Sequence, residues 1–348
     1  MSVLVRLVIL ISLSFNIFLK SFANELPPYI WTKVNNKITV ALKPDQHRFI
    51  DSNITVIESE KFLIIVDAYD NLQNAHALID DINQKWEKPV KYIINTHWHS
   101  DHILANQLYQ DRFDGEQIFI AHSSFKQTLS SKAQIQLNEK REQWATAINN
   151  AKQKLKQDNP PENLAERIKK TELALNELNS IKIVTPDIFV SDKYEIEDAS
   201  FPIDVMYSGL AHTEGDLIVW LPLQKVLISG DLFDEISFGG HGFISEWQEA
   251  LNRINKLPFE TVIPGHGRIQ RDNQALVNLI KLLQDANNQA EIAIKKGWDK
   301  TTFMESLDLT KYYTPLSDSD ELTQRASRKF LPEFFERAYD LLEQKNKP

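Results

Sequence analysis

The sequence predicts an α/β fold in which two β-sheets pack together and helices cover them. Short apolar segments with the length of strands fall into two groups, one before residue 122 and one after residue 181. Helical segments stand between and around these groups, an order that places helices on the outside of paired sheets. Segment 90–94 is apolar at nearly every position, as expected for a strand buried on both faces.

The first group of strands alternates with helices. In segment 71–86 the apolar residues recur at helical spacing, from Leu72 to Trp86. Segment 90–95 leads directly into a stretch rich in histidine, and a further helix follows that stretch. The elements predicted here are strands 54–58, 62–67, 90–95 and 117–121 and helices 71–86 and 103–109.

The second group of strands leads into a strongly helical tail. Strand patterns occur at 182–190, 203–208, 217–221, 226–229 and 261–263, with one helix at 246–257. Beyond residue 272, helices are predicted at 273–296, 302–307 and 317–344. We therefore expect a main domain over residues 24–272 and a helical C-terminal extension over residues 273–348.

Residues 123–180 form an insertion that differs in composition from its surroundings, being rich in Lys, Gln, Glu and Ala. Pro160 and Pro161 interrupt it once, which predicts a hairpin of two helices. Its apolar contacts are assigned to Leu155, Leu164, Ile168, Leu173, Leu175 and Leu178. The charged residues are expected to form a solvated face, and a lid over the active site and a dimer contact are the other roles left open.

The N-terminus has the pattern of a secretory signal peptide. Arg6 precedes an apolar run over residues 7–19, and Ser21 and Ala23 place small residues at positions −3 and −1 of a cleavage site. The run is shorter than the ~20 apolar residues that a membrane span needs. The sequence therefore predicts cleavage after Ala23 and export to the periplasm, with no stable membrane insertion afterwards. An uncleaved anchor, to which Lys20 points, and a buried helix are the alternatives.

Charge and cysteine content limit the chemistry. The net charge is −9 and becomes −11 if residues 1–23 are removed, since they hold two basic residues and no acid. An acidic surface repels phosphate backbones, so no nucleic acid is expected as a partner. The chain contains no cysteine, which excludes thiolate nucleophiles, thiolate metal ligands and disulfides. A small molecule is the expected substrate, and the oligomeric state is left open.

Seven side chains suited to binding a metal ion follow predicted strands. Four of them fall within residues 97–102, directly after strand 90–95, and the others each follow a later strand. Such loops lie at the edge of a sheet, where functional groups are mounted on a rigid scaffold. Imidazole and carboxylate are ligands that zinc accepts. The predicted metal site consists of His97, His99, Asp101, His102, His212, Asp231 and His266.

Four ordered motifs resemble those of the metallo-β-lactamase superfamily. They lie at 96–102, 209–216, 229–231 and 264–267, and the resemblance extends over residues 54–268. It implies an αββα sandwich, which agrees with the elements above. It also implies a site for two metal ions. His97, His99 and His212 would hold one ion, Asp101, His102 and His266 the second, and Asp231 would bridge them.

The resemblance also implies hydrolysis. Two Zn²⁺ ions, with iron or manganese as alternatives, would share a water and lower its pKa from ~15.7 to near neutrality. The resulting hydroxide would attack a carbonyl carbon. Asp101 and Asp231 are the candidate catalytic residues, and Trp98 and His241 are the candidate substrate contacts.

Single residues separate this chain from several branches of the superfamily. The diiron flavoproteins have Glu where this chain has His99, and the best-known zinc β-lactamases have Cys, or in another class Ser, where it has Asp231. The persulfide dioxygenases lack a complete second set of ligands. The bridging aspartate resembles that of glyoxalase II and lactonases, but the glutathione-binding basic residues of glyoxalase II have no match here.

The function expected from the sequence is therefore a metal-dependent hydrolase of a β-lactam, lactone, thioester or other ester or amide in the periplasm. Two alternatives stay open. One is a metal-binding protein of the same fold without catalytic activity, which the complete set of ligands disfavours. The other is a phosphodiesterase or nuclease of the superfamily, which the acidic surface disfavours.

Overall fold

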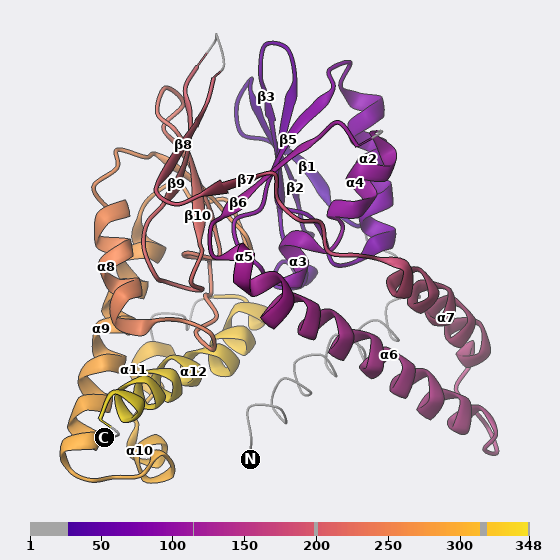
Figure 1. Cartoon of the computed structure of the whole chain (residues 1–348). Helices are drawn as coiled ribbons and strands as arrows, with labels where there is room; N and C mark the ends of the chain where they lie inside the picture. The colour runs from indigo at the N-terminus through magenta and orange to yellow at the C-terminus, as the bar shows by residue number, and fades with distance from the viewer. Residues whose placement is uncertain (1–26, 114, 198–200, 314–318, 347–348) are drawn as a thin grey trace.

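The computed structural model of the chain describes residues 27–113, 115–197, 201–313 and 319–346. Two β-sheets pack face to face and helices cover both outer faces, so the predicted αββα arrangement is confirmed (Figure 1). The predicted signal peptide at 1–23 lies outside the described residues. None of the helices within the described ranges is long and apolar enough to cross a membrane.

The first sheet contains seven strands from the first half of the chain, in the order β1 to β7. The last four run parallel, so their carboxyl ends share one edge of the sheet. The first three are antiparallel to their neighbours. The strands are β1 (Ile30–Lys33), β2 (Ile38–Leu42), β3 (Ile54–Glu58), β4 (Leu63–Val66), β5 (Val90–Ile94), β6 (Ile118–His122) and β7 (Ile188–Val190).

The second sheet contains five strands in the order β12-β11-β10-β9-β8. β11 and β12 run parallel, and the other neighbours are antiparallel. The strands are β8 (Lys193–Ile196), β9 (Ile203–Tyr207), β10 (Leu217–Leu221), β11 (Val226–Gly230) and β12 (Thr261–Pro264).

Apolar side chains of both sheets pack against each other and form the inner core, among them Ile64, Ile94, Val219 and Ile228. Each fully buried side chain of this kind stabilises the fold by about 1.5–3 kcal/mol. The outer faces of the sheets form two further cores with the covering helices. These helices are α2 (Leu72–Lys85) and α4 (Asn106–Arg112) on the first sheet and α8 (Ile244–Ile254) and α9 (Gln274–Lys295) on the second.

The C-terminal helices pack against the second sheet's outer layer. They are α10 (Lys300–Ser306), α11 (Thr310–Tyr313) and α12 (Glu321–Lys345), and the longest of them, α12, lies against α9. Asp320 caps α12 by accepting a hydrogen bond from the backbone N–H of Thr323. Its carboxylate also pairs with Arg48 at 2.8 Å, which attaches this end of the extension to the main domain.

The insertion forms the predicted helical hairpin and projects from the body of the molecule (Figure 1). It comprises α5 (Phe125–Thr128), a π-helical turn (Leu129–Ala133), α6 (Gln134–Leu155) and α7 (Leu164–Ser180). Leu164 and Ile168 are buried together with Ile148 of α6. Leu155 and Leu173 are 37% and 61% exposed, so the prediction that both supply apolar contacts is wrong.

Several elements differ from the sequence prediction. Strands β1, β2 and β8 were not predicted. Of residues 182–190, only Ile188–Val190 forms a strand. The helix predicted at 103–109 is two short helices, α3 (Ser100–Ile103) and α4, because the chain turns at residues 104–105. As a result, Asp101 and His102 lie within α3.

Candidate metal centre

Most of the predicted metal-binding residues follow the carboxyl ends of parallel strands. His97 and His99 follow β5, while Asp231 and His266 follow β11 and β12. His212 lies in the loop between β9 and β10. The structure brings all seven predicted side chains together at one end of the two sheets. Sites in open α/β sheets form at this end of the strands because neighbouring loops converge there.

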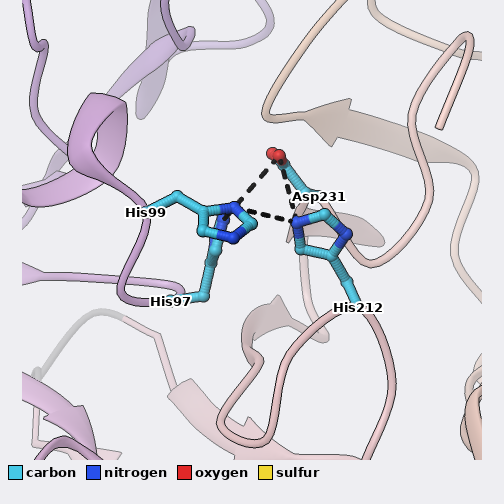
Figure 2. A group of neighbouring side chains, drawn as sticks. All are labelled: His97, His99, His212 and Asp231. Atoms are coloured by element: carbon cyan, nitrogen blue, oxygen red, sulfur yellow. Dashed lines mark hydrogen bonds and ion pairs between the residues drawn. The ribbon is translucent and has the colours of Figure 1, made fainter. Parts of the chain in front are cut away.

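One group consists of His97, His99, His212 and Asp231, whose ligand atoms lie within 4.8 Å of one another. Figure 2 shows the three imidazoles and the carboxylate facing a common point. Nδ1 of His99 lies 2.9 Å from Nε2 of His97 and 3.1 Å from Nε2 of His212. All four side chains are buried. His99 therefore presents Nδ1 to the group, whereas the other two histidines present Nε2.

The second group consists of Asp101, His102 and His266. Nε2 of His266 lies 3.1 Å from Oδ2 of Asp101, and Nε2 of His102 lies 3.6 Å from the same oxygen. Asp231 reaches this group as well, with its oxygens 3.3 Å from Nε2 of His102 and 3.4 Å from Nε2 of His266. Asp231 thus stands between the two groups.

Side chains behind the histidines fix how the rings are oriented. Asp67, at the end of β4, approaches Nδ1 of His102 at 2.9 Å and accepts a hydrogen bond from the backbone N–H of Thr96 at 2.8 Å. Nδ1 of His212 lies 3.1 Å from the carbonyl oxygen of Phe238. In each case the bonded nitrogen faces away from the groups, which leaves the other nitrogen free to bind a metal.

Gly265 makes the close approach of two loops feasible. A Cβ atom at this position would lie 2.0 Å from Oδ1 of Asp231 and 3.1 Å from Cε1 of His102. Any residue other than glycine would push the loop that carries His266 away from Asp231. The glycine before His266 in the Pro-Gly-His-Gly motif is therefore required by the geometry of the site.

Burial lowers the pKa values of the histidines in the site, whereas the charges of the neighbouring aspartates raise them. Burial lowers the pKa of His97, His99 and His212, which favours the neutral form that binds metals. Burial alone would lower the pKa of His102 and His266 too, but nearby Asp231 and Asp101 hold both pKa values well above 6.5. Without a cation, the carboxylates are thus balanced by protonated imidazoles.

The donor atoms fit a metal ion. Nε2 of His102 and Oδ1 of Asp231 are buried and lie 3.3 Å apart, and neither atom forms a hydrogen bond within the described residues. Buried polar atoms are rarely left without partners, and such a cost is removed when they coordinate a cation. Nitrogen and carboxylate oxygen donors, without sulfur, suit zinc and also accept iron or manganese.

The family model of the metallo-β-lactamase superfamily matches residues 47–266, which include all seven residues of the site. The chain belongs to this superfamily. It is a superfamily of metal-dependent hydrolases, so membership agrees with the cluster of histidine and aspartate side chains. Helices α9 to α12 lie outside the matched segment.

Relatives and solved structures agree with this assignment. A metallo-β-lactamase type 2 from Bacillus cereus is 24% identical over 244 residues, covering 68% of this chain and 74% of that protein. The structure of a metallo-β-lactamase from Pontibacter korlensis matches 74% of this chain and 99% of its own, at 18% identity and a TM-score of 0.50. The DIM-1 metallo-β-lactamase matches 75% and 100%, at 21% identity and a TM-score of 0.50. At these identities the structures support the fold alone.

The two predicted substrate contacts lie beside the first group. Nδ1 of His241 is 2.8 Å from Nε2 of His99, so this ring contacts a predicted ligand directly. Trp98 is only 4% exposed, and its indole N–H donates to Glu214 at 3.2 Å. Their contact with substrate stays a prediction, and both residues already have a structural role at the turn that carries His97 and His99.

Asp67 is a residue of the site that the sequence analysis did not identify. Its position at the end of a predicted strand is the single local signal, and its partner His102 lies 35 residues further along the chain. The backbone at Asp67 has a positive φ of 67°, a conformation that Asp and Asn tolerate better than most residues.

Replacing Asp67 with Asn is expected to weaken binding of the second metal ion by about 10–100-fold. The Asn oxygen would keep the hydrogen bond from Thr96, so its amide N–H would face Nδ1 of His102. His102 would then carry its proton on Nε2, the nitrogen that faces Asp231. Titration against a chromophoric chelator measures the two zinc dissociation constants. Unchanged constants would contradict this role, and an unchanged melting temperature of the metal-free protein serves as the control for folding.

Proposed function

We propose that this chain is a hydrolase with two zinc ions that cleaves small carbonyl compounds such as β-lactams, lactones, thioesters and other esters or amides. The observation that carries the proposal is the position of Asp231, whose carboxylate approaches histidines of both groups. A structural zinc site is closed by four ligands and does not need seven. A complete double set that shares one carboxylate is the arrangement expected of a catalytic site.

Each residue has a defined part in the proposal. His97, His99 and His212 would hold one ion, Asp101, His102 and His266 the other, and Asp231 would bind both. The ions would supply Lewis acidity and acidify a water molecule. Burial lowers the pKa of His97, His99 and His212 and keeps these imidazoles neutral, and Asp231 keeps a low pKa beside the histidines. The first group is therefore in the protonation state that metal binding requires, whereas His102 and His266 would release protons when the second ion binds.

The relatives and the residue at position 231 direct the search for the substrate. The named relatives are metallo-β-lactamases, which makes β-lactams the first compounds to test. Asp231 stands where the resemblance places Cys or Ser in the zinc β-lactamases, and this difference keeps lactones and other esters as substrates to test next. The net charge of −9 does not favour a polyanionic substrate.

Export to the periplasm is also part of the proposal and rests on the pattern of residues 1–23. An exported enzyme meets β-lactams and lactones, whereas glutathione thioesters are cytosolic. Fractionation of cells that produce the chain tests export directly. Recovery of the protein in the cytoplasm with its first residues intact would contradict it.

Hydrolysis of a chromogenic cephalosporin by the zinc-loaded protein, with and without a chelator, tests the function. We expect turnover that the chelator removes and added zinc restores. A zinc-replete protein without turnover would exclude β-lactams, and a panel of lactones, thioesters and esters would follow. A protein that hydrolyses none of these compounds would contradict the proposed function.

A further inference from the structure

The metal-binding turn His97-Trp98-His99-Ser100-Asp101-His102 contains two residues that are not predicted ligands. Trp98 separates His97 from His99, and Ser100 separates His99 from Asp101. Both of these residues are held by side chains of the insertion or by partners that the insertion fixes. The sequence alone leaves the role of the insertion open, and these contacts point to a specific one.

The insertion holds Trp98 through Glu214 and Lys132. The indole N–H of Trp98 donates to Glu214 at 3.2 Å, and Nζ of Lys132 pairs with the other oxygen of that carboxylate at 2.6 Å. Nζ of Lys132 also lies 5.3 Å from the centre of the Trp98 ring, within the range of a cation–π interaction. Lys132 belongs to the π-helical turn that leads into α6.

The insertion holds Ser100 from two sides. The backbone N–H of Ser100 donates to Oε1 of Gln136 at 3.0 Å. The hydroxyl of Ser100 donates to Oδ2 of Asp70 at 3.3 Å, and Lys140 pairs with the same oxygen. Ser100 is the first residue of α3, whose N-cap residue His99 provides no side-chain cap. Gln136 therefore satisfies a backbone donor that the first turn of a helix leaves without a partner.

Lys132, Gln136 and Lys140 are spaced four residues apart, which places them along one side of the helical segment that starts the insertion. We refer to these three residues as the insertion stripe. Figure 1 shows the beginning of α6 beside α3, whereas the rest of α6 extends away from the sheets. The stripe therefore lies on the part of the insertion that reaches the metal-binding turn.

We propose that the insertion stripe positions the metal-binding turn, with Gln136 and Lys140 orienting Asp101 and His102 through Ser100, and Lys132 orienting His97 and His99 through Trp98. These three are positioning residues, because each acts through another side chain or the backbone. The proposal rests on the metal-ligand assignments of the proposed function and assigns the base of the hairpin to the metal centre. It thereby distinguishes the base from the exposed tip of the hairpin.

The variant Gln136→Leu tests the proposal, because it removes the acceptor for the Ser100 N–H and leaves a side chain of similar size. We expect zinc binding by Asp101, His102 and His266 to weaken by about tenfold, as on loss of an outer partner of a ligand. The zinc ion held by His97, His99 and His212 should bind as in the unchanged protein. Titration of the purified protein against a chromophoric chelator resolves the two dissociation constants.

Two further variants separate positioning from general destabilisation. Gln136→Glu keeps an oxygen acceptor and should restore the affinity, whereas Gln153→Leu makes the same change at an exposed position of α6 and should have no effect. If Gln136→Leu does not fold, Lys140→Met is compared with the exposed control Lys154→Met, and the same weakening of the second constant is expected.

The outcomes distinguish this inference from the function on which it rests. Unchanged constants in Gln136→Leu and Lys140→Met, an equal loss at both metal ions, or a failure of Gln136→Glu to restore affinity would overturn the role of the stripe. An unchanged protein that binds no zinc would instead overturn the proposed function itself.

Discussion

Replacing Asp231 with Ala is expected to abolish turnover and to remove at least one metal ion from each chain. The carboxylate of Asp231 lies 3.7 Å from Nε2 of His97 and 3.3 Å from Nε2 of His102, so its loss takes a ligand from both groups. The effect on metal affinity should exceed the ~10–100-fold typical of an outer partner. Elemental analysis of metal per chain and kcat/KM on the identified substrate measure the two effects.

The exposed Asp158 in the hairpin provides a matched control, since Asp158→Ala makes the same change far from the site. It should leave metal content and turnover unchanged. If Asp231→Ala retained two metal ions and full activity, the bridging position of this carboxylate would be wrong. Loss of one ion with full activity would contradict the requirement for two.

Removing the metal ions with a chelator is expected to abolish turnover and to lower thermal stability, with both restored by zinc. A ligand that binds only the folded state stabilises it by about 4 kcal/mol when its free concentration is 1,000 times Kd. For a chain of this size, that difference lowers the melting temperature by roughly six degrees. The buried carboxylates and imidazoles stay together without metal, balanced by charge, so the metal-free protein should remain folded at room temperature.

Thermal unfolding followed by circular dichroism, with and without the chelator, measures this difference. The variant Asp231→Ala should show a much smaller difference, because it binds less metal in the first place. Equal melting temperatures for the zinc-loaded and metal-free protein would contradict binding of zinc at a buried site. Turnover that survives complete metal removal would contradict the metal-dependent mechanism.

The ligands could be identified from the sequence because they stand close together or directly after strong strand signals. His97, His99, Asp101 and His102 fall within six residues, and Asp231 and His266 each follow an apolar segment that forms a strand. A strand in a sheet that is covered by the other sheet on one face and by helices on the other is apolar on both faces, so its end is easy to recognise. The loops after parallel strands then meet at one edge, which brings distant ligands together.

The partners behind the ligands could not be predicted in this way. Asp67 contacts His102 from another strand, and Gln136 contacts Ser100 from the insertion, 36 residues away. Neither contact leaves a periodic pattern, because each depends on how the elements pack. Strand β8 was missed since its sequence, Lys193–Ile196, is half charged and partly exposed at the edge of the sheet. By contrast, β2 is as apolar as the predicted strands, and its signal was present in the sequence.

Anomalous diffraction at the zinc absorption edge from crystals of the zinc-loaded protein tests the central claim most directly. We expect two peaks per chain. One should be bounded by His97, His99 and His212, the other by Asp101, His102 and His266, with Asp231 between them. A single peak, or peaks bound by other side chains, would contradict a two-metal centre built from these seven residues.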